Sequence, residues 1–229
     1  FYVAPKEPRP TKPQAVAKPN PAATKPVLPP QPDLNKRWND LVNLKIKPKP
    51  VEDYLTTKRK IQPGIVTDMI ESKIIIPGRS TFNNQPLFFA AFRSMEGEIT
   101  AIQEISTDGP ITKGGAKKKF QSKSRIKDHG FFALGPDYNK VDTVLISESV
   151  INAITTYQAI PDALSIAIGS SNFTAKLSKL SKSIKDKTII LCFDNDLPGR
   201  KATHSATNAL NLQTHRIMWT KDQPAGTDI

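Results

Sequence analysis

Beyond residue 140, the chain alternates between two patterns of hydrophobic and polar positions. Apolar runs at 141–148, 163–168 and 188–193 are typical of strands covered on both faces. After each run, apolar residues recur at helical spacing, in 149–159, in 175–184 and from Arg200 onward, where Pro198 and Gly199 predict a turn. This alternation predicts a parallel α/β sheet whose strand-end loops gather at one edge.

Polar residues follow each of the predicted strands. Glu148 follows the first, Gly169 opens a polar turn after the second, and Asp194, Asn195 and Asp196 follow the third. Carboxylates at i and i+2 point the same way and lie within reach of one hard cation. Asp-Asn-Asp is also ordinary turn chemistry after a strand, so the pair alone leaves both interpretations open. A third acid converging on the same edge favours a metal site.

The first half of the chain has a different pattern. Residues 1–33 contain half of the 20 prolines and predict a disordered, extended linker. They lack the layout of a signal peptide, and no apolar run reaches the roughly 20 residues of a membrane span. From the opening linker and an uncapped end at Ile229, we expect a fragment at both ends. A small α+β segment follows, with helices predicted at 36–44, 51–61 and 65–72, a turn at 62–64, and a hairpin of 87–93 and 99–105.

The net charge of +12 is spread unevenly. Residues 34–130 hold 18 basic and 10 acidic residues, whereas 131–229 hold 10 and 9. The chain is most basic at 113–125. Runs of charge are usually solvated loops, but this run also suits contact with phosphates and contains an aromatic ring that can stack on a base. Because the positive charge lies next to the acidic edge, we favour DNA binding. The residues concerned are Lys117, Lys118, Lys119, Phe120, Lys123 and Arg125.

The cysteine and histidine residues narrow the chemistry. Cys192 is the single cysteine and lies inside an apolar strand, which indicates an inert core residue. An internal disulfide and a cysteine-based zinc site within the chain are therefore excluded. His129, His204 and His215 show no metal-ligand spacing.

The three strand ends resemble the Toprim domains of bacterial DnaG-type primases, topoisomerases and related nucleases. The family pattern is a glutamate, a glycine turn and Asp-x-Asp after successive strands, which here are Glu148, Gly169, Asp194 and Asp196. Residues 193–202, FDNDLPGRKA, are similar to the primase version, in which Gly-Arg follows the acids. The resemblance covers about residues 141–229 and is strongest to primases of plasmids, phages and integrative elements.

Two positions depart from the family pattern, and neither removes a ligand. Ser149 follows the glutamate where primases often have glycine, and Asn195 lies between the aspartates. The helix–helix–hairpin order before residue 130, and the segment YLTTKRKIQPGIVTDMI, are similar to the subdomain that precedes the Toprim fold in these primases. After the linker predicted at 1–33, the resemblance thus implies a basic α+β subdomain at 34–130 and a Toprim catalytic domain at 131–229.

The resemblance implies the catalytic core of a DNA primase, a nucleotidyltransferase that makes short RNA primers on single-stranded DNA. It implies ribonucleoside triphosphates as substrates, a replicative helicase as partner, no membrane and a cytoplasmic location. The zinc-binding domain that such primases carry would precede the linker. A Toprim nuclease using the same acids, and a non-catalytic nucleic-acid-binding module, remain as alternatives. The intact acids argue against the module, and the lack of a nucleophilic tyrosine domain argues against a topoisomerase.

The resemblance also assigns roles to residues. The catalytic residues and ligands of Mg²⁺ or Mn²⁺ are Glu148, Asp194 and Asp196, with Asp228 as a further metal ligand. The residues expected to contact nucleotide phosphates are Gly169, Arg200 and Lys201. The two basic residues begin a helix, where the dipole favours anions, and ion pairs with the acids are their alternative role.

Overall fold

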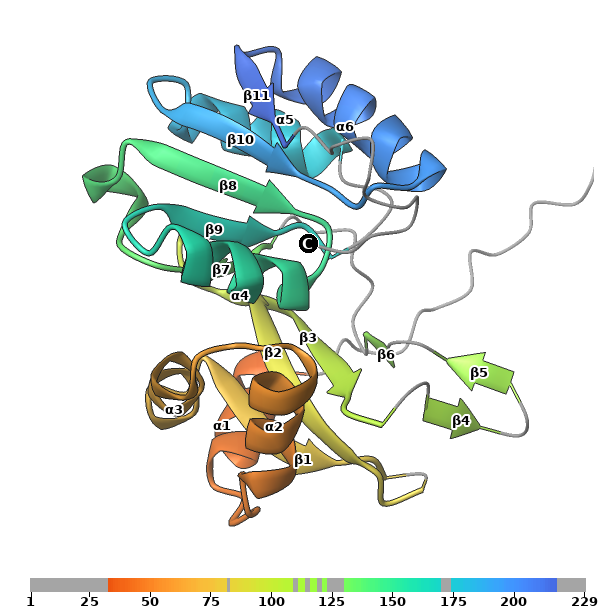
Figure 1. Cartoon of the computed structure of the whole chain (residues 1–229). Coiled ribbons are helices and arrows are strands. Elements are labelled where there is room, and N and C mark those ends of the chain that lie inside the picture. Colours follow the sequence, from red (N-terminus) through yellow and green to blue (C-terminus); the bar gives the residue numbers. More distant parts are fainter. Residues whose placement is uncertain are drawn as a thin grey trace, which may run out of the picture. The chain divides into compact units, whose positions relative to one another are not determined.

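The computed structural model (Figure 1) describes most of the chain after the proline-rich segment. The described residues are 33–81, 83–108, 111–113, 116–118, 121–122, 130–169 and 174–217, and they belong to one compact unit that starts at Pro32. The predicted linker lies outside this part, apart from Asp33. No helix among the described residues is long and apolar enough to cross a membrane.

Helices cover both faces of a first sheet. They are α1 (Leu34–Val42), α2 (Lys49–Asp53), the π-helix η1 (Tyr54–Lys58) and α3 (Pro63–Glu71). Each predicted helix forms, but the one expected at 51–61 is split into α2 and η1. The expected turn at 62–64 is partly wrong, because Pro63 begins α3. A proline fits this position, since the backbone N–H that it lacks would have no partner within the helix.

The first sheet has the strand order β1-β2-β3-β6 and is antiparallel. Its strands are β1 (Ile75–Arg79), β2 (Pro86–Arg93), β3 (Ile99–Ser106) and β6 (Gln121–Ser122). The predicted hairpin is confirmed as β2 and β3, whereas β1 was not predicted. Pro77 hides this strand in the sequence, and a proline is tolerated there because β1 is at the edge of the sheet.

The second sheet has the order β11-β10-β8-β9-β7. Its strands are β7 (Phe132–Leu134), β8 (Thr143–Ser147), β9 (Leu164–Ala167), β10 (Thr188–Cys192) and β11 (Thr214–Arg216). The predicted parallel pairing is confirmed for β9, β8 and β10, and β11 extends it. The edge strand β7 runs antiparallel to β9, so the sheet is mixed.

Three helices flank the second sheet, with the short 3-10 helix η2 (Tyr138–Lys140) leading into β8 (Figure 1). They are α4 (Val150–Ala159), α5 (Thr174–Ser183) and α6 (Leu197–Leu210). Apolar residues of α5 and α6 pack with Val144, Ile146 and Ile189 of the sheet. Those of α4 belong to a different cluster, so α4 lies on the opposite face. The predicted α/β architecture, a mainly parallel sheet between helices, is confirmed.

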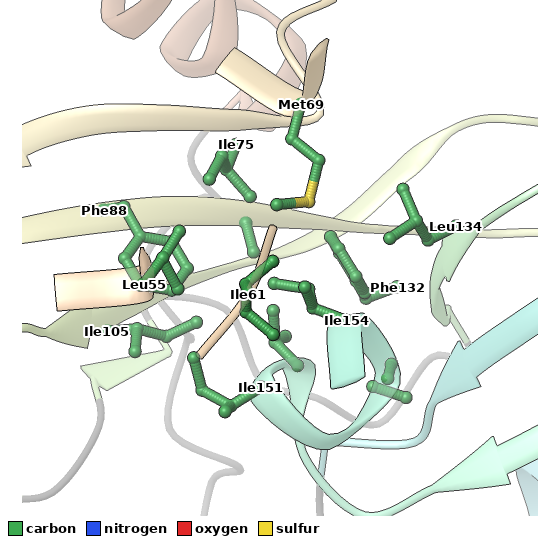
Figure 2. Close-up of a cluster of buried hydrophobic side chains, with 14 of the residues drawn as sticks. Leu55, Ile61, Met69, Ile75, Phe88, Ile105, Phe132, Leu134, Ile151 and Ile154 are labelled. Atoms are coloured by element: carbon green, nitrogen blue, oxygen red, sulfur yellow. The ribbon is translucent and has the colours of Figure 1, made fainter. Parts of the chain in front are cut away.

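One hydrophobic core joins the two sheets (Figure 2). Leu55 and Met69 come from the helices of the first sheet, Phe88 comes from β2, Phe132 comes from β7, and Ile154 comes from α4. All of these side chains are almost completely buried. The first sheet is therefore fixed against the α4 face of the second, and the carboxyl ends of the parallel strands keep a defined position relative to it.

Candidate functional site

Two of the predicted acids leave the same edge of the second sheet. Strands β8 and β10 are adjacent and parallel, and their register pairs Ser147 with Cys192. Glu148 therefore leaves β8, and Asp194 leaves β10 after Phe193, at neighbouring strand ends. Glu148 is exposed and Asp194 is half-buried. The topology accordingly brings these acids to one edge, as the sequence predicts.

Asp194 is held by a residue that the sequence analysis did not identify. The side-chain amide of Asn152 donates a hydrogen bond of 2.7 Å to Asp194 Oδ1. Asn152 is buried in α4, and the Ser149 hydroxyl, which caps this helix, both donates to its Oδ1 and accepts from its backbone N–H. The signal was present in the sequence, since an asparagine on the apolar side of a helix requires a polar partner.

Asp196 is the N-cap of α6. Its Oδ1 accepts a hydrogen bond of 2.6 Å from the backbone N–H of Gly199, and its backbone carbonyl accepts from Arg200 N at 3.0 Å. The helix begins at Leu197, so the expected turn at Pro198 and Gly199 is wrong. A proline fits the first turn of a helix, and the cap supplies the acceptor that Gly199 needs. Asp196 therefore has a structural role at the start of α6, as the interpretation of Asp-Asn-Asp as turn chemistry predicts. Its other carboxylate oxygen remains available to a ligand.

Gly199 is the second residue that the sequence analysis missed. A Cβ atom at this position would collide with the carbonyl oxygen of Asp194 and lie 3.0 Å from Asp196 Oδ1. Only glycine lets the first turn of α6 pass so close to the two aspartates. The Gly-Arg sequence after the acids was noted, but the steric reason for the glycine depends on this close approach.

Gly169 lies where the sequence predicts a turn. It has a positive φ of 66°, which favours glycine, and its N–H donates a hydrogen bond of 2.9 Å to the carbonyl oxygen of Glu148. A side chain at Gly169 would also collide with the ring of Phe92. The turn after β9 is thus joined to the backbone of Glu148 and packed against the first sheet.

Arg200 and Lys201 are exposed on the first turn of α6. Within the described ranges, no ion pair joins either side chain to an acid. Their predicted phosphate contact stays a prediction.

The remaining predicted residues are described in part or not at all. Lys117 and Lys118 lie in β5 (Ala116–Lys118). This strand pairs with β4 (Ile111–Lys113) in a separate two-stranded antiparallel sheet. Neither strand was predicted. The predicted site residues outside the described ranges are Lys119, Phe120, Lys123, Arg125 and Asp228.

The donor set at the strand ends fits a hard cation in its chemistry. Carboxylate oxygens from Glu148, Asp194 and Asp196 are the ligands that Mg²⁺ prefers. Beside them, the hydroxyl of Ser147 is buried and has no hydrogen-bond partner among the described residues. In the described part of the chain, no three His, Cys, Asp or Glu side chains converge closely enough to hold a metal ion as they stand. Asp194 and Asp196 each accept a protein hydrogen bond at Oδ1, which leaves acceptor capacity on both carboxylates.

The remaining candidate groups are Cys192, His204, His215 and one cavity. Burial raises the pKa of the Cys192 thiol to about 12, which confirms the interpretation of an inert core residue. His204 and His215 are exposed. A cavity of about 520 Å³ has Trp38, Phe131 and Tyr138 in its lining. It reaches Leu164 at the start of β9, away from the acids at the strand ends.

Comparisons with known proteins support the resemblance to Toprim domains. Residues 145–229 match the family model described as Toprim-like. The RNA polymerase domain of Mycobacterium tuberculosis primase DnaG, in complex with double-stranded DNA, is similar with a TM-score of 0.55 and 16% identity over 85% of this chain and 72% of that one. No curated protein sequence matches the chain.

Two further solved structures share the fold. The primase fragment of the bacteriophage T7 primase-helicase has a TM-score of 0.52 at 18% identity over 71% of this chain, which spans 64% of that fragment. The DnaG primase catalytic domain bound to single-stranded DNA has a TM-score of 0.51 at 14% identity, over 84% of this chain and 70% of that one. The chain therefore carries a Toprim-like domain within the fold of the primase catalytic core.

Proposed function

We propose that the chain is the catalytic core of a DNA primase, which synthesises short RNA primers on a single-stranded DNA template. One observation carries the proposal: the acid-ended parallel strands are joined through one core to an antiparallel sheet, in the fold of primase catalytic cores. A Toprim-like domain on its own would support a nuclease equally well. The additional sheet favours the primase.

In this proposal Glu148, Asp194 and Asp196 hold Mg²⁺ or Mn²⁺, with Asp228 as a further ligand. The bound ion would neutralise triphosphate charge and align the attacking and leaving oxygens. The residues of the chain orient the site: Asn152 holds Asp194, and the N-cap bond holds Asp196 at the start of α6.

The nucleotide would lie across the strand ends. The start of α6 presents its helix dipole and the exposed side chains of Arg200 and Lys201, and these favour phosphate. The Gly169 turn offers a backbone that a phosphate can approach closely. The expected partners are a DNA template, ribonucleoside triphosphates and a replicative helicase, in a bacterial cytoplasm. Among proteins of this fold, bacteriophage T7 primase domains have been seen interacting with the lagging-strand DNA polymerase, in a structure that contains an RNA/DNA hybrid and dTTP.

A single assay tests the proposal. The full chain is incubated with single-stranded DNA, labelled ribonucleotides and Mg²⁺ or Mn²⁺. New oligoribonucleotides that depend on the template are the expected result. Shortened template without new oligoribonucleotides would instead identify a nuclease. If neither new oligoribonucleotides nor shortened template form, the chain would be a non-catalytic binding module.

Replacing Asn152 by alanine is expected to weaken Mn²⁺ binding by about 10- to 100-fold. Residues that hold a metal ligand in place typically have effects of this size, and Asn152 provides the amide that orients Asp194. Calorimetric titration with Mn²⁺ measures the change. Asn139→Ala, on an exposed 3-10 helix, is the control and should bind as the wild type does. Equal affinity in both variants would contradict the role of Asn152.

Neutralising the basic segment should weaken the binding of single-stranded DNA. Each phosphate contact contributes about −0.7 to the slope of log affinity against log salt, so losing three contacts should flatten the slope by roughly 2. The substituted residues are Lys117, Lys118, Lys119, Lys123 and Arg125. If the ring of Phe120 stacks on a base, Phe120→Ala should weaken the free energy of DNA binding by about 1–3 kcal/mol, with little change in the salt slope. Fluorescence anisotropy in a salt series separates the two effects, and a wild-type slope in the multiple variant would leave the segment as a solvated loop.

A further inference from the structure

A lysine is buried behind the Gly169 turn, and the proposed chemistry does not use it. Lys176 lies on α5 with only 1% of its surface exposed, and it is among the largest fully buried side chains of the described residues. Long charged side chains are almost never fully buried unless their charge is compensated. Burying Lys176 therefore costs free energy, and the contacts of its ammonium group must offset that cost.

The ammonium group of Lys176 bonds to two backbone carbonyls from distant segments. Nζ donates to the carbonyl oxygen of Ile168 at 3.0 Å and lies 3.4 Å from that of Gly130. It also lies 5.8 Å from the centre of the Phe92 ring, within the range of a cation–π contact. Burial lowers the pKa of the group, as expected where backbone oxygens replace water.

Each partner of Lys176 is itself fixed. Gly130 follows the basic segment in the sequence, and a side chain there would collide with Thr100 of β3. The next residue, Phe131, bridges to Arg93 of β2 through two backbone hydrogen bonds of 2.8 and 2.9 Å. Lys176 thus bonds to the point where the chain returns from the basic segment to the sheets.

The other partner, Ile168, lies beside the strand end that carries Glu148. Ile168 N donates to the carbonyl of Ser147 at 3.0 Å, and Gly169 N donates to that of Glu148 at 2.9 Å. The ring of Phe92 fills the space that a side chain at Gly169 would need. The carbonyl that Lys176 binds therefore belongs to the segment that carries the Gly169 turn beside Glu148.

We infer that Lys176 is a positioning residue, whose ammonium group fixes the Gly169 turn against the acidic edge and against the return of the basic segment at Gly130. The inference rests on the proposed function in one respect, namely that the fixed turn receives the nucleotide phosphates. Lys176 touches no reacting group. Its loss should accordingly change how tightly nucleotide binds rather than how fast bound nucleotide reacts.

The test compares Lys176→Met with the wild type by two measurements. Methionine keeps most of the length and apolar body of lysine but cannot donate to either carbonyl. Hydrogen exchange of peptides covering 165–169 should become about tenfold faster, as the loss of one buried hydrogen bond predicts, while peptides of β10 are unchanged. The KM for ribonucleotides should rise by about tenfold with kcat within a factor of about three of the wild type.

Lys182→Met is the matched control, because Lys182 is exposed on the same helix. It should match the wild type in both measurements. Lys176→Arg retains a donor for the two carbonyls and should restore most of the KM. If Lys176→Met does not fold, Lys176→Gln is measured in its place, since a shorter amide cannot span both carbonyls.

Wild-type exchange at 165–169 in the variant would overturn the inference, whatever the activity. Faster exchange with an unchanged KM would overturn it as well, because the turn would then have no part in nucleotide binding. A wild-type protein that makes no primers would refute the proposed function instead. The exchange result would still report on the turn itself.

Discussion

Replacing Asp194 by asparagine is expected to lower the rate of primer synthesis by about 100- to 1,000-fold. A bound cation contributes several kcal/mol to stabilising the transition state in phosphoryl chemistry, and about 1.4 kcal/mol corresponds to a factor of ten. The amide of asparagine is neutral and a poor ligand for Mg²⁺. Asp196→Asn and Glu148→Gln should have effects of the same order. Primer yield at ordinary Mg²⁺ concentrations measures them.

The fold should survive these substitutions. Asparagine at 194 still offers an oxygen to the amide of Asn152, and asparagine caps helices as well as aspartate does, so α6 keeps its start. Thermal unfolding should stay within a few degrees of the wild type. Asp186→Asn, in the exposed turn before β10, is the control and should be fully active. Wild-type activity in both aspartate variants would remove the metal-site proposal.

Replacing Gly199 by alanine should be nearly as damaging, for a steric reason. The new methyl group would collide with the carbonyl of Asp194 and crowd Asp196 Oδ1, so the strand end or the helix start must move. Overpacking of this kind costs about 1–3 kcal/mol of folding free energy. A displacement of about 1 Å at a catalytic group can cost 100-fold in rate. We expect both losses, measured by denaturant unfolding and by primer synthesis.

Gly64→Ala provides a matched control. Gly64 also follows a proline in the first turn of a helix, yet nothing lies within 4 Å of a Cβ at that position. Alanine should therefore raise the free energy of unfolding by about 0.5–1 kcal/mol, because glycine is the poorer helix former. Equal destabilisation by both substitutions would show that the helix start, and not the aspartates, determines the effect at Gly199.

The sequence predicts the order of the main elements because their apolar runs are long enough to show a period. It fails at the short edge strands. β7 has three residues and β1 contains a proline and a glycine, so neither shows strand periodicity. β7 pairs with β9, which lies far away in the sequence, whereas β1 becomes a strand by pairing with the next strand, β2. The antiparallel direction of β7 is likewise set by where the chain returns at Phe131.

The acids of the site could be predicted because each directly follows an apolar strand. Asn152 could not be assigned its role because it bonds to Asp194 across the fold, and Gly199 could not because its close approach to Asp194 depends on how the chain turns from β10 into α6. Lys176 is similar: its spacing marks it as one more basic residue of a helix, and only the packing of α5 over Gly130 buries it. Sequence patterns locate strand ends, but they do not reveal which side chains the folded chain brings behind them.

The core that joins the two sheets has a consequence for how the protein is made. Synthesis proceeds from the N-terminus, so Leu55, Met69 and Phe88 leave the ribosome before Phe132 and Ile154, which complete their cluster. The first sheet can thus serve as the surface onto which α4 and β7 dock. A shorter chain beginning at residue 131 would expose the apolar face of α4 to water and to other chains. Transferred alone to another protein, the Toprim-like region would need a substitute for that partner to stay folded and in solution.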